Sequence, residues 1–463
     1  MRARYLFVAI SVALWTLSCA VHQVRHDALP PASVPEHFSD SGGTVDPPDR
    51  WWVAFNDPAL NTLVESTLSD NLDLGTAWAR LDQARALARI AGANNSPTLD
   101  LSTGARRGRM QEFMGTTTDS QFSLGFSTAY EVDLWKRIDS LESAAELDVL
   151  ATRQDLEATA LALTSQVAQF WFSIIEQRSQ RGLLSDQIQI SETFLELVEL
   201  RFGQGRASAV DVYQQREQVA SVRAQIPNVE SRTQVLLNQL AVLLGQSPTT
   251  DVSAEGEELP ELPPQPLVGI PMELLQKRPD IRSAQIRIAA ADHRLAAAIA
   301  DRLPTLRLGG QSSYGGSEIG DLFSNWMWNL AANLVTPVID GGRRKAEVER
   351  NRAVITERLH QYEKAVLTAL QEVENVLVRE QKQTTYVKEL ETQLDIARKT
   401  LEESRSRYTN GLTDYLPVLT ALQSVQRLER TLLTAHLDLI SFRIDLYRSL
   451  GGAWTSELVG SEQ

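Results

Sequence analysis

The chain shows alternation of apolar and polar residues over two segments that are long for strands. One face of each segment is apolar or aromatic, with Phe122, Leu124 and Phe126 in residues 122–134 and Trp326, Trp328 and Leu330 in residues 326–334. Alternation over about 13 residues is longer than a usual soluble strand and suits a tilted strand in a membrane. Aromatic residues at one end of such a face are typical of a membrane interface.

Each alternating segment follows a more polar, glycine-rich segment, which begins at Thr98 in one case and at Thr305 in the other. Each pair predicts one hairpin, so the chain has four strands. Four strands cannot close a barrel, and open edges in lipid leave unpaired backbone groups that cost several kcal/mol each. If the strands lie in a membrane, the protein must therefore oligomerise. The alternative is the edge of a soluble β-sandwich.

Two very long segments predict helices. Residues 139–202 contain no proline and only Gly182 as glycine, and residues 343–408 contain neither. A helix of about 64 residues would reach roughly 95 Å. An apolar pattern of this length that contains no helix-capping residues inside it indicates a coiled coil.

The last helical segment has a heptad seam, meaning apolar residues at alternating spacings of three and four. Its members are Val418, Ala421, Val425, Leu428, Leu432, Ala435, Leu439, Phe442 and Leu446. An earlier segment has a similar seam. Its apolar members are Val212, Val219, Val222, Ile226, Val229, Leu236 and Leu240, and the polar residues Gln215 and Thr233 occupy the two remaining seam positions. Pro227 lies inside that helix and predicts a local kink.

The sequence contains the same design twice. Segments around Pro97-Thr98, Arg201-Phe202 and Leu244-Gly245 recur around Pro304-Thr305, Arg407-Tyr408 and Leu450-Gly451. All three pairs are separated by about 206 residues, which indicates an internal repeat. The order within each copy is helix, two strands, long helix, tight turn and second helix.

The tight turn of each copy contains residues suited to helix ends. We expect Gly205 to end the long helix in the left-handed conformation, and Ser208 with Asp211 to form a capping box for the next helix. Gly411 and Asp414 occupy the same places in the second copy. These turns are predicted to be the tips of antiparallel helical hairpins.

Composition narrows the possible functions. The 463 residues have a net charge of −14, which argues against a nucleic-acid partner, and the single cysteine excludes a disulfide framework or a cysteine-based zinc cluster. The six histidines are dispersed; His22 and His26 have metal-like spacing but no ordered partners in sequence. We find no nucleophile elbow or phosphate loop, so we expect no enzyme activity, no cofactor and no metal.

The N-terminus has the pattern of an export signal. Residues 1–18 contain a short basic start and an apolar stretch too short to cross a bilayer. Cys19 follows a small residue, an arrangement that resembles a bacterial lipobox and implies acylation of that cysteine. Ala20 after the cysteine favours the outer membrane by the same resemblance. Residues 19–50 are rich in proline and predict an extended lipidated linker. The alternative is an ordinary signal peptide.

Residues 51–454 resemble the TolC-like outer-membrane efflux proteins, in particular the lipoprotein branch that serves resistance-nodulation-division pumps. The matching motifs are Trp51-Trp52 with Asp57-Pro58, Arg278-Pro279-Asp280, Leu303-Pro304-Thr305-Leu306, Asp340-Gly341-Gly342-Arg343, Tyr408 with Gly411 and Tyr415-Leu416, and Leu450-Gly451-Gly452 with Trp454. Residues 51–250 and 271–455 are the expected repeats, residues 251–270 a proline-rich linker and residues 456–463 a tail.

The resemblance implies a mixed fold: a homotrimer with a 12-stranded membrane β-barrel, four strands per chain, continued by a long α-helical coiled-coil barrel. It implies a passive outer-membrane conduit for small molecules, which works with a periplasmic adaptor and an inner-membrane pump. The family's tunnel closes at the turn regions, so Gly205, Ser208, Asp211, Gly411 and Asp414 become gate candidates. Thr420 occupies the place where many relatives have an acidic residue, which argues against the usual acidic ring.

Two other functions fit parts of this pattern. A type I export channel for proteins or peptides would share the fold, and the lipobox and the Trp51-Trp52 block favour the efflux branch. A structural lipoprotein that spaces the envelope would use the coiled coils but would need no membrane hairpins.

Overall fold

The structure, a computed structural model, describes residues 22, 34–40, 42–46, 48–112, 115–248, 256, 258–452 and 454–460. Cys19 and the export signal lie outside these residues. The first copy comprises η1 (Trp51–Phe55), α2 (Pro58–Asp70), α3 (Leu72–Ala93), β1 (Thr98–Glu112), β2 (Gly115–Val132), α4 (Arg137–Gly203), α5 (Ala209–Arg223) and α6 (Ile226–Leu243). The second comprises α7 (Pro271–Lys277), α8 (Pro279–Ala300), β3 (Thr305–Gly316), η2 (Ile319–Asp321), β4 (Trp326–Val335), α9 (Arg343–Thr409), α10 (Leu416–Leu450) and α11 (Thr455–Gly460).

The order of elements confirms two copies of one design, and α4 and α9 confirm the two long helices. The chain forms two compact units, and each contains parts of both copies. The first unit contains residues 79–153 and 282–364, with all four strands; the second contains residues 31–78, 154–281 and 365–463.

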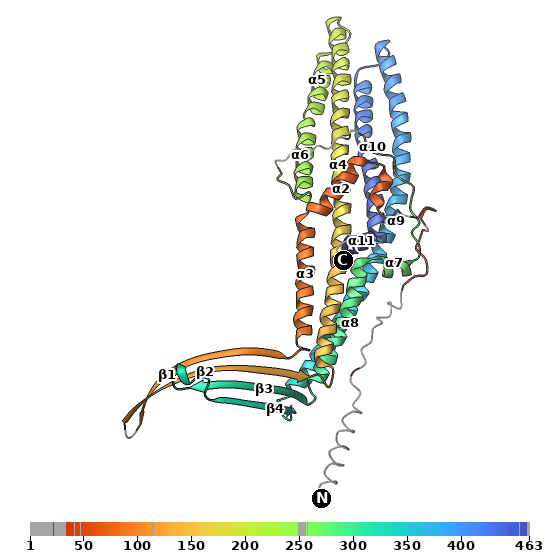
Figure 1. Ribbon diagram of the computed structural model, residues 1–463. Coiled ribbons are helices and arrows are strands. Elements are labelled where there is room, and N and C mark those ends of the chain that lie inside the picture. The colour runs from red at the N-terminus through yellow and green to blue at the C-terminus, as the bar shows by residue number, and fades with distance from the viewer. Residues whose placement is uncertain are drawn as a thin grey trace. The chain divides into compact units, whose positions relative to one another are not determined.

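The first unit contains one antiparallel sheet with the strand order β1-β2-β3-β4 (Figure 1). The β1–β2 ladder extends to the pair Glu112↔Gly115, whereas the β2–β3 ladder ends at Phe122↔Gly316. The β1–β2 hairpin therefore extends beyond the ends of β3 and β4, as Figure 1 shows. Both outer strands, β1 and β4, have one edge without a partner strand among the residues that the structure describes.

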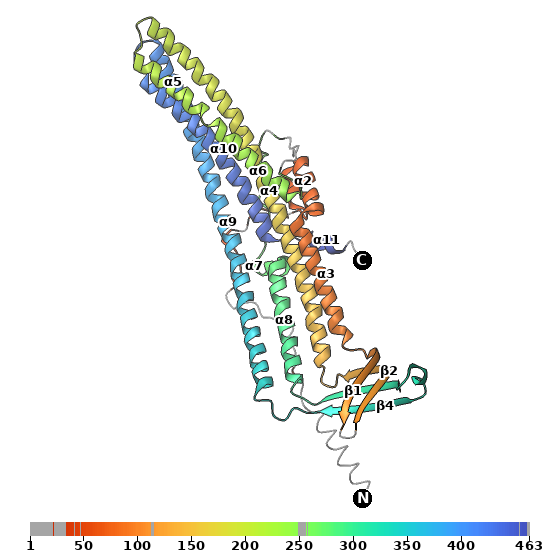
Figure 2. The same ribbon diagram turned by 90° about the vertical axis from the view of Figure 1, so that its left-hand side faces the viewer.

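The second unit is helical, and α5 and α6 run back beside α4 (Figure 2). Ion pairs at the surface join α4 to both returning helices. The kink predicted at Pro227 was underestimated: the helix breaks, so that α5 ends at Arg223 and α6 begins at Ile226. Proline has no amide hydrogen and fits the first turn of a helix, which explains why α6 starts beside it.

Both heptad seams are buried within the chain. Val418, Ala421, Val425, Leu428, Ala435 and Leu446 of α10 are buried, and Leu432, Leu439 and Phe442 are half-buried. In the earlier seam Val212, Val219, Val222, Val229 and Leu240 are buried, and Gln215 is fully buried at its expected seam position. These contacts confirm the periodicity as a packing pattern.

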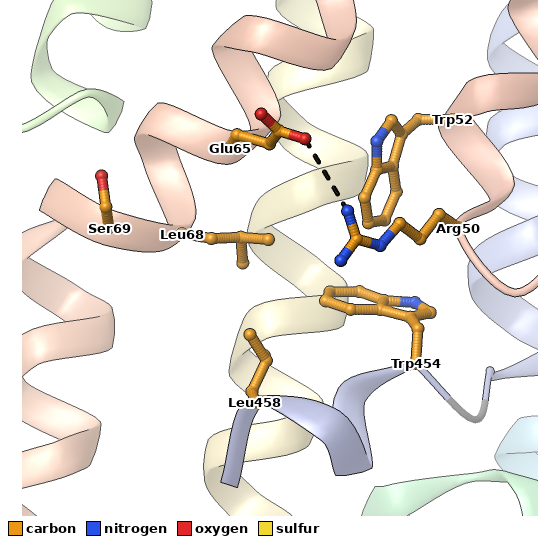
Figure 3. A pocket seen from close by; sticks show the side chains of 7 residues that line it. All are labelled: Arg50, Trp52, Glu65, Leu68, Ser69, Trp454 and Leu458. Atoms are coloured by element: carbon orange, nitrogen blue, oxygen red, sulfur yellow. Dashed lines mark ion pairs between the residues drawn. The ribbon is translucent and has the colours of Figure 1, made fainter. Parts of the chain in front are cut away.

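The Trp51-Trp52 block forms an aromatic core with the end of α10 and with Trp454, which directly precedes α11. Trp51 stacks on Tyr447 with ring centroids 5.7 Å apart, and Trp52 meets Trp454 edge-on at 4.9 Å. Figure 3 shows the guanidinium group of Arg50 between the indoles of Trp52 and Trp454, where it faces Glu65 at 3.7 Å. Aromatic packing of this kind holds the segment that precedes α2 against the end of α10 and the segment after it.

Candidate functional site: one face of the sheet and the turns of the helical hairpins

Cross-strand pairing gives the sheet one apolar face and one polar face. Paired residues share a face, because side chains alternate along each strand. The apolar face contains Leu99, Leu101, Phe122, Leu124, Phe126, Tyr130, Val132, Leu306, Leu308, Tyr314, Trp326, Trp328, Leu330 and Leu334. The opposite face contains Asp100, Ser102, Gln121, Ser123, Ser127, Glu131, Arg307, Gln311, Ser313, Asn329 and Asn333.

The apolar face is uncovered in the single chain. Trp326, Trp328 and Leu330 are 58%, 64% and 77% exposed, and Phe126 is 47% exposed. Exposed apolar patches of this extent in soluble proteins mark interaction sites or membrane contact. Together with the two outer strand edges, which have no partner strand among the described residues, this face is suited to contact with lipid and to pairing with additional strands.

The two helix-hairpin turns have the same hydrogen-bond geometry. Gly205 has φ +70° and its amide donates to the carbonyl of Phe202 at 2.9 Å, while the next amide, of Arg206, donates to Arg201 at 2.8 Å. Gly411 has φ +72° and repeats the pair of bonds. A glycine in the left-handed conformation, with these two bonds, is the Schellman ending of a helix. The predicted role of both glycines is confirmed.

The helices that follow these turns begin differently. At α5 the Ser208 amide donates to Asp211 Oδ2 at 2.8 Å, and the Asp211 amide donates to Ser208 Oγ at 3.2 Å, so the predicted capping box is present. At α10 the N-cap residue is Tyr415 in a helical conformation, with no side-chain capping bond. Capping is therefore wrong as a role for Asp414, because Pro417 moves the helix start past it.

Thr420 is exposed on the second turn of α10, and its hydroxyl donates to the carbonyl of Leu416 at 2.9 Å. Asp414 is also exposed, whereas Asp211 is half-buried. Of the two candidate gate carboxylates, Asp211 is held by the capping box, and the Asp414 side chain has no hydrogen bond or ion pair among the described residues.

Next to the turns, a cluster of aromatic residues joins the two hairpins. Tyr408 of α9 and Tyr415 lie with ring centroids 5.2 Å apart. The Arg201 guanidinium lies 4.5 Å from the Tyr408 ring and donates to the Thr409 carbonyl at 3.0 Å. Tyr415 is fully buried, and its hydroxyl donates to Gln215 Oε1 at 2.6 Å. Arg201 and Gln215 come from the first copy and the tyrosines from the second, so this cluster links the copies.

The electrostatics of the cluster keep both tyrosines neutral. Burial raises the pKa of Tyr415, and the nearby Tyr408 and Asp211 raise this pKa further. Burial also raises the pKa of Tyr408, although the Arg201 guanidinium opposes that rise. Neutral phenols can donate hydrogen bonds at any physiological pH, so the link from Tyr415 to Gln215 does not depend on pH.

A polar network inside the helical packing was missed by the sequence reasoning. Gln426 of α10 donates to Ser191 Oγ at 3.0 Å and accepts from Gln218 Nε2 at 2.8 Å, and Gln187 donates to the Gln426 carbonyl at 3.0 Å. All four side chains are buried. The glutamines repeated along the two hairpins were the available signal of such a network. Their partners, however, lie more than 200 positions away in the sequence, so the pairs could not be assigned.

No group of three potential metal ligands occurs among the described residues. His22 contacts a carboxylate, with Nε2 2.5 Å from Asp292 Oδ1, and His26 lies outside the described residues.

The chain matches one protein family over most of its length. The family is described as outer membrane efflux protein, and the match covers residues 63–246 and 270–452, one segment in each copy. The pyoverdine export outer membrane protein OpmQ of Pseudomonas aeruginosa is 34% identical over 421 residues, 89% of each chain. The solvent efflux pump outer membrane protein SrpC of Pseudomonas putida is 31% identical over 419 residues, 87% of each chain.

Solved structures agree with this match. The outer-membrane channel OprN superposes with a TM-score of 0.86 at 26% identity, over 93% of this chain and 99% of that one. The open state of the MtrE outer membrane channel of Neisseria gonorrhoeae gives 0.83 at 25% identity, over 93% and 98%. The doubled design, the sheet with one apolar face and the helical hairpins thus have counterparts in known channels, and the chain belongs to the outer membrane efflux protein family.

Proposed function

We propose that this protein is the outer-membrane channel of a tripartite pump that exports small organic molecules. The observation that supports this most strongly is the four-stranded sheet with one exposed apolar face and two unpaired edges. Three copies would supply twelve strands, which is enough to close a barrel around a water-filled lumen. The polar face of the sheet would then line that lumen.

The channel is a passive conduit, so a periplasmic adaptor and an inner-membrane pump supply the energy and the coupling. Relatives named for pyoverdine, solvent and toluene export favour small organic cargo over protein cargo. A deletion strain, tested against dyes, antibiotics, organic solvents and metal ions, should become at least about fourfold more susceptible to some organic compounds. Plasmid-borne wild-type protein should restore resistance.

The alternative, a type I export channel for proteins or peptides, predicts a different phenotype. Deletion would then leave susceptibility unchanged and would remove one or more proteins from the culture medium. Comparing the secreted proteins of the same two strains separates the two functions directly.

We also propose that Cys19 is acylated and anchors the N-terminus in the outer membrane. Several acyl chains, at about 0.8 kcal/mol per buried methylene group, anchor a protein stably. Metabolic labelling with a fatty-acid analogue should label the wild type and leave Cys19→Ser unlabelled. A variant that keeps the label would contradict the assignment.

For gating, we propose that the two hairpin turns narrow the periplasmic end of the channel, and that Asp211 and Asp414 contribute charge there. The adaptor must bind the open arrangement more tightly than the closed one, because only a difference in affinity shifts a population. Gly205, Ser208, Gly411 and Thr420 would form the surrounding tip surface.

Alanine variants separate the charge of these residues from their structural roles. Asp211→Ala removes a carboxylate and half of a capping box, at a cost of about 1 kcal/mol of stability, whereas Asp414→Ala removes charge only. Both variants should raise single-channel conductance in planar bilayers and lower cation selectivity. If both variants have the conductance and ion selectivity of the wild type, Asp211 and Asp414 have no role in the gate.

A further inference from the structure

Beyond the apolar part of the sheet, β1 contains three arginines whose side chains alternate between the two faces. Arg107 pairs with Ser120 and Arg109 with Thr118, and both partners lie on the same face as Phe122. Arg106 pairs with Gln121 and lies on the polar face. Arg107 and Arg109 therefore continue the apolar face outward, past its last aromatic residue on β2.

The positions of the two arginines match the headgroup layer of a bilayer. Arg107 lies two positions and Arg109 four positions beyond the Phe122 row, on strands that rise about 3.3 Å per residue. With a strand tilt near 40°, these steps place them roughly 5 Å and 10 Å outside the row. Each headgroup layer is about 5–8 Å thick, and long arginine side chains bend toward it.

The aromatic residues of the neighbouring strands mark the same boundary. Trp326 is the first residue of β4 and pairs with Tyr314 of β3, and Trp326 is 58% exposed on the apolar face. Tryptophan and tyrosine concentrate at the headgroup level of membrane proteins. The arginines thus lie just outside a row of interface aromatics, at the end of the sheet opposite the strand-to-helix connections.

Neither guanidinium group is neutralised within the described part of the chain. Arg107 and Arg109 are exposed, and their side chains have no ion pair or hydrogen bond among these residues. Their cross-strand neighbours Ser120 and Thr118 are neutral, and the nearby Asp119 pairs with Gly108 on the other face. Guanidinium groups match phosphate oxygens in geometry and charge better than any other side chain.

We propose that Arg107 and Arg109 bind the phosphate groups of membrane lipids at the outer surface of the outer membrane, which fixes the depth of the hairpin. This inference rests on the proposed insertion of the sheet as a barrel. It assigns the surface to a lipid rather than to a soluble anion, because both side chains lie on the lipid face of the strand and directly above its apolar band.

The test compares Arg107→Gln/Arg109→Gln with Arg106→Gln, a neighbouring substitution of the same chemistry on the polar face. Full-length protein in neutral detergent would be titrated with phosphorylated lipid A and with its dephosphorylated form, and binding read by native mass spectrometry. The double variant should bind the phosphorylated probe roughly 30-fold more weakly, which is about 2 kcal/mol. Arg106→Gln should bind it as the wild type does, and dephosphorylation should abolish the difference.

Wild-type affinity in the double variant, or an equal loss in Arg106→Gln, would overturn the proposal. So would equal binding of soluble inorganic phosphate and phosphorylated lipid, because the surface would then not be specific for lipid. Conductance in planar bilayers separates a failure of the lipid-binding proposal from a failure of the proposed channel function. Wild-type protein that forms no channels would contradict barrel insertion itself, whatever the lipid-binding result.

Discussion

The hydroxyl of Tyr415 donates to Gln215 Oε1 at 2.6 Å, and both side chains are fully buried. The bond connects the start of α10 with α5, two helices from different copies of the repeat. Gln215 Nε2 in turn donates to the Ser191 carbonyl of α4 at 2.6 Å. One side chain therefore holds three helices together directly beside the turns.

Removing the Tyr415 hydroxyl should loosen this junction. Tyr415→Phe leaves Gln215 Oε1 buried without a donor, which costs about 1–3 kcal/mol. Thermal unfolding should show a lower midpoint, and planar-bilayer recordings should show more frequent opening. Tyr408→Phe is the matched control, because the Tyr408 hydroxyl is buried with no hydrogen-bond partner in the described part of the chain. Equal effects of both substitutions would argue against a specific role for this bond.

The buried glutamines should behave as a coupled pair. Gln426→Leu leaves Gln218 Nε2 buried without its acceptor, which costs about 1–3 kcal/mol, whereas the Ser191 hydroxyl still donates to the Gln187 carbonyl. Gln218→Leu/Gln426→Leu removes both members of the pair and should recover part of that loss. A double-mutant cycle from denaturant unfolding measures the coupling. Strict additivity would show that the two amides contribute independently.

Asp445 gives the helical unit a defined pH dependence. Burial raises the pKa of this carboxyl, against the opposing effect of Arg448 and Arg379. The folded protein therefore holds the proton more tightly than the unfolded chain, whose aspartates titrate near about 3.9. The stability from this group is complete below the unfolded pKa and is lost as the pH rises through the folded one.

Asp445→Asn keeps an acceptor for Gln169, whose amide donates to Oδ1 at 3.0 Å, and removes the charge. The variant should match the wild type in strong acid and become more stable than it as the pH rises to 7. Unfolding midpoints of both proteins across that range provide the measurement. A constant difference between the two curves would contradict the assignment.

Two glycines with the same backbone conformation should differ in their tolerance to alanine. Gly205 and Gly245 both have φ +70°, where a side chain costs about 1–2 kcal/mol. A Cβ at Gly205 meets nothing within 4 Å, whereas one at Gly245 would lie 2.3 Å from the Asp70 carbonyl oxygen. Gly245→Ala should therefore lose a further 1–3 kcal/mol or so. Equal unfolding midpoints for the two variants would refute the steric argument.

Much of this architecture follows from local patterns in the sequence. The seam residues of α10 repeat with a period that only a coiled coil requires, and the alternation at Phe122, Leu124 and Phe126 specifies which strand face is apolar. Gly205 and Ser208 with Asp211 follow rules that act within six residues. Such features depend on residues that are close together in the sequence, so they can be predicted from a single sequence.

Contacts between the copies could not be read in this way. Tyr415 and Gln215 are 200 positions apart. Within the second copy, the buried pair of Arg443 with Glu380 likewise depends on how α9 and α10 pack. The capping role weighed for Asp414 failed because Pro417 determined where α10 begins. At Pro227 the local rule predicted a kink, and the structure has a full break between Arg223 and Ile226.

The pairing of β2 with β3 has a consequence for biogenesis. The two strands come from different copies, and their paired residues are 174 to 194 positions apart, a separation that makes sheet formation slow. β2 is synthesised long before the strand that pairs with it, so the exposed apolar face of the first hairpin lacks this neighbour until β3 follows, and a transiently exposed face of this kind is prone to aggregation. We therefore expect the yield of mature protein to depend on how soon β3 reaches β2.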